Sequence, residues 1–101
     1  MKFLIISKNK YMAPPELMPS LVDATLAWAR KYEGQIEQIW SFAGQQAGGG
    51  IADVESLEEL NTITGEFPLC QFSEIGVYPL VDLVVSLQQQ KETLQNISAR
   101  V

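Results

Sequence analysis

The chain has 101 residues, of which 47 % are hydrophobic and 19 % are charged, and its net charge is −5. A chain of this length folds as one domain, because two separate cores would each bury too little surface. The acidic balance, without a cluster of lysine or arginine, argues against binding to a phosphate backbone or an anionic membrane. We therefore expect one domain, residues 1–101, that binds neither nucleic acid nor membrane.

The sequence contains no histidine and a single cysteine, Cys70. One cysteine cannot form an internal disulfide, and without histidine the usual zinc, haem and Ser-His-Asp sites lack their ligands or base. No stretch reaches the roughly 20 apolar residues that cross a bilayer, and no signal-peptide pattern is present. We expect a cytoplasmic protein with no metal and no cofactor, in which Cys70 is an apolar filler rather than a nucleophile.

The N-terminal half predicts a strand, a helix and a hairpin. Residues Lys2–Ser7 are rich in β-branched and aromatic side chains, which favours a strand. A helix from about Pro15 to Gly34 carries apolar residues at three- and four-residue spacing. Residues 35–42 and 50–54 have the character of two further short strands, so the glycine-rich segment 44–50 is predicted to be the turn between them.

The C-terminal half predicts a helix, a strand and a final helix. Ser56 and Glu59 have the spacing of a capping box, so a helix begins there and runs to about Glu66. Residues 72–78 then form the fourth strand. Beyond Pro79, a helix with a glutamine-rich side carries an apolar stripe on its other side, made by Leu80, Leu83, Val84, Leu87, Leu94, Ile97 and Val101.

The predicted order β-α-β-β-α-β indicates an α+β, ferredoxin-like domain: two helices on one face of a four-stranded antiparallel sheet, plus an extra C-terminal helix. The other face also needs cover, because Leu4 and Ile6 point away from Phe3 and Ile5 and both pairs are apolar. We infer that a second copy packs on this face across a two-fold axis, as a dimeric α/β barrel. The final helix either packs on its own sheet or reaches a neighbouring subunit.

Four segments of the sequence resemble the muconolactone delta-isomerase family: Ile39–Gly44, Asp53–Leu60, Phe67–Leu69 and Ile75–Val77. They include the Trp-x-x-Ala-Gly step, the Asp-Val-x-Ser-x-Glu-x-Leu helix start and the Pro-Leu pair before the last strand. The resemblance implies a homodimer that can assemble into a decamer. It also implies chemistry without metal or organic cofactor, in which a double bond moves within a lactone.

An isomerase without a cofactor needs a group that removes and returns a proton beside a carbonyl, and a cation or donor that stabilises the developing charge. Glu74 is the predicted proton shuttle, because strand parity places it on the side of Phe72 and Tyr78. Lys8, with the parity of Leu4 and Ile6 on the first strand, is the predicted anchor for a substrate anion. The further candidates for substrate binding are Phe72 and Tyr78 themselves, Tyr11, the aromatic pair Trp40 and Phe42, and Gln45 and Gln46 in the hairpin loop.

Each candidate also has a simpler interpretation as an exposed strand end, a core aromatic or a hairpin tip. Two functions therefore stay open. One is a cofactor-independent isomerase or cyclase of a small unsaturated carboxylated ring compound. The other is a non-catalytic oligomeric module, either ligand-binding or structural. A cofactor-free oxygenase on the same scaffold is a third hypothesis.

Overall fold

The computed structural model of the protein describes residues 1–100. Two short 3-10 helices, η1 and η2, accompany the regular elements. The elements in chain order are β1 (Lys2–Asn9), η1 (Pro15–Leu17), α1 (Met18–Lys31), β2 (Ile36–Ser41), β3 (Ala47–Asp53), α2 (Leu57–Gly65), η2 (Cys70–Phe72), β4 (Ser73–Leu80) and α3 (Leu83–Ala99).

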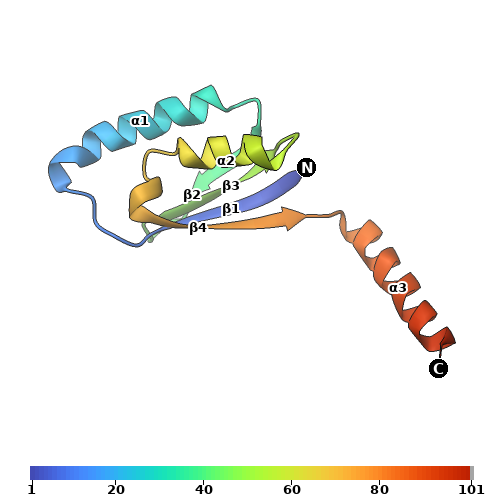
Figure 1. Ribbon diagram of the computed structural model, residues 1–101. Helices are drawn as coiled ribbons and strands as arrows, with labels where there is room; N and C mark the ends of the chain where they lie inside the picture. The colour runs from blue at the N-terminus through green and yellow to red at the C-terminus, as the bar shows by residue number, and fades with distance from the viewer. Residues whose placement is uncertain (101) are drawn as a thin grey trace.

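The four strands form one antiparallel sheet in the order β2-β3-β1-β4. Helices α1 and α2 both lie on one face of this sheet, and no helix covers the other face (Figure 1). This order and this layering confirm the ferredoxin-like α+β fold. Strands β1 and β3 are the two central strands, and β2 and β4 are the edge strands.

The core lies between the sheet and the two helices. Phe3 is directly opposite Ala52 on β3 and Pro79 on β4, so the odd-numbered residues of β1 face the helices. Partly buried Ile5, Trp28 and Ile36 pack against this core. Its buried members are Phe3, Tyr32, Ala52, Val54, Leu60 and Ile63.

Helix starts are set by local caps. The Ser56 hydroxyl accepts a hydrogen bond of 3.1 Å from the Glu59 amide, as the capping box predicts. A capping box also predicts that the Glu59 carboxylate accepts from the Ser56 amide. This part of the prediction is wrong, because the carboxylate accepts from the Glu55 amide at 3.0 Å instead. Asp82 caps α3 in the same way, accepting from the Val85 amide at 3.2 Å.

The three consecutive glycines lie within strand β3, so the prediction that they form the hairpin turn is wrong. A Cβ atom would lie 2.8 Å from the Trp40 carbonyl oxygen at Gly48 and 2.6 Å from the Gln38 carbonyl oxygen at Gly50. These positions accept only glycine without a shift of the backbone, because the neighbouring strand approaches too closely for a side chain. The turn itself is shorter and contains Gly44, whose φ is +77°.

The last strand and last helix are also displaced from their predicted bounds. Phe72 belongs to η2, and β4 runs from Ser73 to Leu80 with Pro79 inside it. A proline is tolerated there because β4 is an edge strand, where one side of the backbone has no partner. Leu80 therefore lies on β4 and not on the final helix, and Val101 lies outside the described residues.

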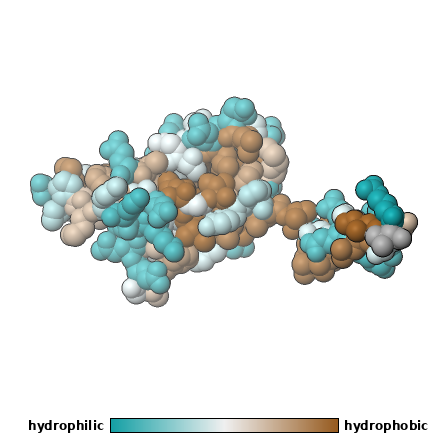
Figure 2. Space-filling model, turned by 60° about the horizontal axis from the view of Figure 1, so that its bottom comes forward, coloured by the Kyte–Doolittle hydropathy of each residue, from teal (hydrophilic) through white to brown (hydrophobic). Residues whose placement is uncertain are grey.

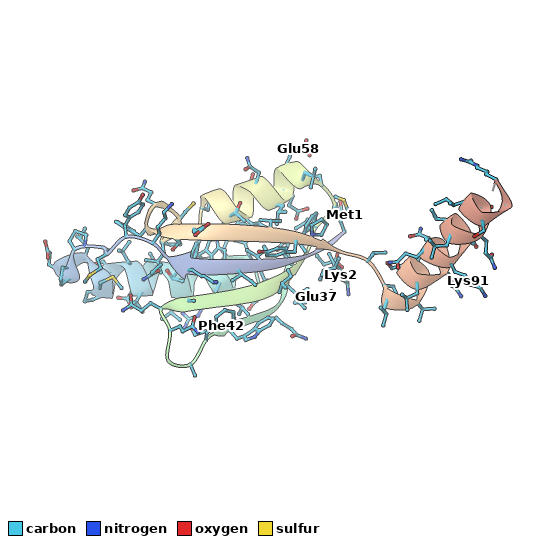
Figure 3. The ribbon with its side chains drawn as sticks, turned by 90° about the horizontal axis from the view of Figure 1, so that it is seen from below. Met1, Lys2, Glu37, Phe42, Glu58 and Lys91 are labelled. Atoms are coloured by element: carbon cyan, nitrogen blue, oxygen red, sulfur yellow. The ribbon has the colours of Figure 1, made fainter. Side chains whose placement is uncertain are left out.

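Two ion pairs lie at the end of the sheet where β1 begins. Lys2 and Glu37 lie close together in Figure 3, and their Nζ and Oε1 atoms are 3.1 Å apart. The amino group of Met1 is 3.2 Å from Oδ1 of Asp53. These contacts tie β1 to both of the strands on that side of it.

Helix α3 projects away from the rest of the domain (Figure 1), which gives the molecule extents of 64 × 26 × 23 Å. Figure 2 shows hydrophobic residues gathered over the middle of the body and along the link to α3. None of the helices within residues 1–100 has the length and apolar character needed to cross a membrane.

Candidate functional site

A cavity of about 620 Å³ lies between α1 and the β2–β3 side of the sheet. Its floor is the backbone of Gly48, Gly49 and Gly50, and Met18, Thr25 and Leu26 are among the residues of α1 that border it. Gly48 and Gly50 have no side chains, so the space between β3 and α1 stays open at these positions. The glycine segment therefore makes room for a ligand next to the sheet.

The inner end of the cavity is apolar and held in place by Trp28. The Trp28 indole N–H donates a hydrogen bond of 2.9 Å to the Ile63 carbonyl. Its ring centroid lies 4.9 Å from that of Phe67, in a tilted contact. All three residues line the cavity. The ring of Trp28 is thus fixed between the two helices and forms a rigid wall.

The opposite end of the cavity carries neutral polar groups. The register places Ser7 on β1 and Ser41 on β2 on either side of Gly48. Next to them, the Asn9 side-chain amide donates to Oε1 of Gln46 at 3.0 Å, and the Asn9 backbone N–H donates to the Gln46 carbonyl at 3.0 Å. Hydroxyl and amide groups at this end can bind a carbonyl or hydroxyl of a ligand.

Among the described residues that line the cavity, none carries an ionisable side chain. Residues 1–100 also contain no group of three or more His, Cys, Asp or Glu side chains able to hold a metal ion. Within one subunit the walls therefore provide apolar surface and neutral hydrogen-bonding groups.

A cluster of three side chains joins the C-terminal ends of α1 and α2 behind the cavity. Tyr32 donates a hydrogen bond to the Glu66 carboxylate, and Lys31 Nζ lies 3.0 Å from Oε2 of Glu66. The hydrogen bond from Tyr32, followed by that from Lys31, lowers the pKa of Glu66. The same bonds to Glu66 raise the pKa of Tyr32 and that of Lys31. This cluster links the C-terminal ends of α1 and α2, and both helices contribute residues to the cavity.

The structure brings Glu74 and Lys8 together, as Cα partners directly opposite each other on β4 and β1. Both lie on the sheet face away from the helices, both are exposed, and neither is among the described residues that line the cavity. Tyr78 shares this face, because its ring lies about 3.0 Å from where a Cβ of Gly76 would be. The roles of Glu74 in catalysis and of Lys8 in anion binding stay predictions.

The remaining candidates divide between the cavity and other places. Trp40, Gln45 and Gln46 line the cavity. Tyr11 is 61 % exposed and its ring lies 5.8 Å from Lys10 Nζ. The other two candidates, Phe42 and Phe72, are half-buried and lie outside the cavity lining, as does the half-buried Cys70.

Sequence reasoning missed Trp28, Ser7 and Asn9 as cavity residues. Trp28 fits the apolar stripe of α1, so its spacing predicts a core position and nothing more. The two polar residues end a strand and give no signal of their own. The glycine run carried the available signal, since glycine there permits either a positive φ or the close approach of another chain or a ligand.

Comparisons with known proteins address the family. The family model described as muconolactone delta-isomerase matches residues 1–83. A muconolactone delta-isomerase of Rhodococcus opacus is 33 % identical over 73 residues, covering 66 % of this chain and 78 % of that protein.

Two solved structures share the fold. The crystal structure of a muconolactone isomerase matches with a TM-score of 0.72 and 26 % identity over 81 % of this chain and 90 % of the other. A 5-chloro-2-hydroxyhydroquinone dehydrochlorinase from Burkholderia phenoliruptrix matches with a TM-score of 0.62 and 19 % identity, over 80 % and 94 % of the two chains. On the family match across four-fifths of its length, the chain belongs to the muconolactone delta-isomerase family.

Proposed function

We propose that this protein is a cofactor-independent isomerase, or a closely related enzyme, that acts on a small unsaturated ring compound. The observation that carries the proposal is the cavity of about 620 Å³ on a muconolactone-isomerase fold, apolar at one end and polar at the other. Its volume falls within the roughly 300–1,000 Å³ of small-molecule sites. The R. opacus relative, by its name, acts on a lactone.

The two ends of the cavity suggest how a ring would lie. The apolar edge of the ring would contact Trp28 and Phe67. The carbonyl group of the ring would point to Ser7, Ser41 and the Asn9–Gln46 pair. Hydrogen-bond donors at the carbonyl stabilise the enolate-like charge that forms when a neighbouring proton leaves. The proposal therefore covers binding and charge stabilisation by this subunit.

For a substrate that binds on the free face of the sheet instead, the proton shuttle is Glu74, with Lys8 opposite it as the anion anchor. Both lie across the sheet from the cavity, so within one subunit they do not reach a ligand bound there. They serve catalysis only if the substrate lies on the free face, inside a dimeric barrel made by two sheets. The Glu74→Gln variant distinguishes a substrate in the cavity from a substrate on the free face, because it removes the carboxylate without changing the size of the side chain.

The test is ligand binding followed by proton exchange. Both tryptophans of the chain line the cavity, so their fluorescence reports a ring bound there. Five-membered unsaturated lactones are the probes, and NMR in deuterated water measures exchange of the proton next to the carbonyl. We expect binding that perturbs tryptophan emission, exchange catalysed by the protein, and unchanged binding in Glu74→Gln. Loss of binding in Glu74→Gln would indicate that the substrate binds on the free face of the sheet.

A second candidate is a non-catalytic oligomeric module that binds the same ligands. The specific observation in its favour is the lack of ionisable side chains among the described residues that line the cavity. It predicts saturable binding of lactones with no exchange of their protons above the buffer rate. Exchange that depends on the protein and is lost when Ala29→Phe fills the cavity would refute it.

A further inference from the structure

Two serine side chains flank a bare position on the cavity floor. The register places Ser7 on β1 and Ser41 on β2 directly opposite Gly48 on β3, so the three residues form one row across the sheet. Directly paired residues project from the same face of a sheet, and all three line the cavity. Position 48 stays without a side chain, because a Cβ there would lie 2.8 Å from the Trp40 carbonyl oxygen. The row therefore has a hydroxyl group at each end and open backbone in the middle.

The hydroxyl groups of Ser7 and Ser41 are available to a ligand. The side-chain hydrogen bonds at this end of the sheet join Asn9 to Gln46 and Ser73 to Asn9 and, within residues 1–100, leave both serine hydroxyls without a partner. Polar side chains on the helix side of the cavity already donate to helix carbonyls: Trp28 to Ile63 at 2.9 Å, Thr25 to Leu21 at 2.8 Å and Thr64 to Leu60 at 3.0 Å. A ring in the cavity therefore finds hydrogen-bond partners for its oxygens at the sheet and apolar contacts at the helices.

The spacing of the two hydroxyl groups limits which ligand they can hold together. Neighbouring strands are about 4.8 Å apart, so the Cα atoms of Ser7 and Ser41, two strands apart, are separated by roughly 10 Å. A hydrogen bond of about 2.8 Å at each end would leave roughly 4–5 Å between two oxygens of a ligand. Oxygens on adjacent atoms of a six-membered ring lie closer together than this. A single ring can therefore bridge the row if its two oxygens are on ring atoms that are not adjacent.

The row binds oxygens without supplying a charge. A hydroxyl group both donates and accepts hydrogen bonds, so it can bind a carbonyl or a hydroxyl group of a ligand. A carboxylate in the cavity would lose water without meeting a cation among the described lining residues, and burying an unpaired charge is costly. Lys8, the residue after Ser7, projects from the opposite face of the sheet. An anionic ring is therefore better placed on the free face, and an uncharged ring in the cavity.

We propose that Ser7 and Ser41 determine the ligand specificity of the cavity, and that they hold an uncharged ring over Gly48 through oxygens on two non-adjacent ring atoms. This rests on the proposed function, since it names the substrate class of the same cavity. The class differs from the carboxylated ring expected from the sequence, because two neutral hydroxyl groups recognise the ligand in place of one cation. A ring with a carbonyl at one end of the row and a hydroxyl at the other belongs to it.

The three isomers of dihydroxybenzene test the spacing, because they share their size and composition and are uncharged at neutral pH. Catechol has its oxygens on adjacent carbons, whereas resorcinol and hydroquinone do not. Calorimetric titration in oxygen-free buffer measures their dissociation constants, with phenol as the one-oxygen reference. We expect the tighter-binding of resorcinol and hydroquinone to bind about tenfold more strongly than phenol, and catechol to stay within about twofold of phenol. Catechol that binds as tightly as the other two isomers overturns recognition at two points.

Ser7→Ala and Ser41→Ala test the two residues. Each variant keeps one hydroxyl group, so it should weaken the tighter isomer about tenfold, to the level of phenol, and leave phenol within about twofold. Ser20→Ala changes an exposed serine of α1 outside the described lining and should affect neither probe. Retained binding of phenol shows that the cavity of each variant is folded. Unchanged binding of the tighter isomer, or an equal loss for phenol, overturns the role of the two serines.

Benzamide and benzoate test the charge of the ligand, because they have the same shape and differ by one charge. Competition with the tighter dihydroxybenzene isomer reports on the cavity, and Lys8→Gln removes the cation from the free face. In both the unmodified chain and Lys8→Gln, benzamide should displace the isomer, whereas benzoate should need a concentration at least about tenfold higher. Displacement by benzoate at the same concentration as benzamide in Lys8→Gln overturns the uncharged class.

The unsaturated lactones of the proposed function separate its failure from the failure of this inference. Ala29 lines the cavity, so Ala29→Phe fills it and should abolish the binding of lactones and dihydroxybenzenes alike. If lactones bind to the unmodified chain and no dihydroxybenzene does, the substrate class is overturned and the proposed function stands. If neither kind of probe binds, both are overturned.

Discussion

The indole N–H of Trp28 on α1 donates a hydrogen bond of 2.9 Å to the carbonyl of Ile63 on α2. Ile63 is among the last residues of α2, whose final carbonyls have no partner within the helix. Trp28 therefore both forms the cavity wall and completes the end of the other helix. One side chain links the shape of the site to the stability of the fold.

Trp28→Phe should lower the free energy of unfolding by about 1–3 kcal/mol, because it keeps an aromatic ring but leaves a buried carbonyl without a donor. Urea denaturation followed by circular dichroism measures the change. Trp40→Phe is the control, since the indole N–H of Trp40 makes no hydrogen bond to the described residues and the side chain is 42 % exposed. Equal losses in the two variants would show that the bond to Ile63 contributes little.

Gly50→Ala should destabilise the protein by about 1–3 kcal/mol, because the new Cβ would lie 2.6 Å from the Gln38 carbonyl oxygen and β3 would have to move. Gly65→Ala is its matched control: nothing lies within 4 Å of its Cβ position, at the last residue of α2. The control should be neutral or up to about 1 kcal/mol more stable. Urea midpoints of the two variants should therefore move in opposite directions, and a tolerated Gly50→Ala would contradict the close approach of the strands.

Ser56→Ala should cost about 1 kcal/mol, because it removes the acceptor for the Glu59 amide at the start of α2. Ser56→Asp should recover most of the loss, since a carboxylate accepts the same bond and suits a helix N-terminus. Thermal unfolding followed by calorimetry gives both values. A stable Ser56→Ala with no rescue in Ser56→Asp would mean that the cap contributes nothing to this helix.

The Tyr32–Glu66–Lys31 cluster makes stability depend on pH in two directions. The pKa of Glu66 is lowered in the folded state, first by the bond from Tyr32, so its contribution is present above the unfolded pKa and is lost as pH falls through the folded pKa. The pKa values of Tyr32 and Lys31 are raised by Glu66, so their contributions are present below their unfolded pKa values and are lost as pH rises through the folded ones.

Tyr32→Phe should therefore flatten both limbs of the stability profile. Urea unfolding at closely spaced pH values, from the acid side of a carboxyl to the alkaline side of a phenol, measures this. Glu33→Gln, a neighbouring exposed carboxylate outside the cluster, serves as the control and should keep the profile of the unmodified chain. Identical profiles for Tyr32→Phe and the unmodified chain would contradict the assignment to this cluster.

Local signals in the sequence predicted most of the secondary structure. The hydroxyl of Ser56 and the spacing of apolar residues act within a few residues of chain, so they hold wherever the segment lies. The β-α-β-β-α-β order followed, and with it the ferredoxin-like class. The glycine run was misassigned because glycine favours both a turn and a close strand approach, and only the neighbouring strands distinguish the two.

Strand parity grouped Lys8 with Leu4 on β1 and Glu74 with Tyr78 on β4, and only the register of β1 and β4 shows that both groups share one face. Strand parity could not show which face of the sheet holds a cavity. That depends on how the two helices pack over the sheet, and α1 and α2 are joined by contacts between distant residues: Trp28 with Ile63 and Tyr32 with Glu66, 35 and 34 positions apart. The sequence by itself determined the elements and their order, because those depend on neighbours along the chain. Only the tertiary structure decided where the cavity opens and that α3 leaves the body, because both depend on packing between segments far apart in sequence.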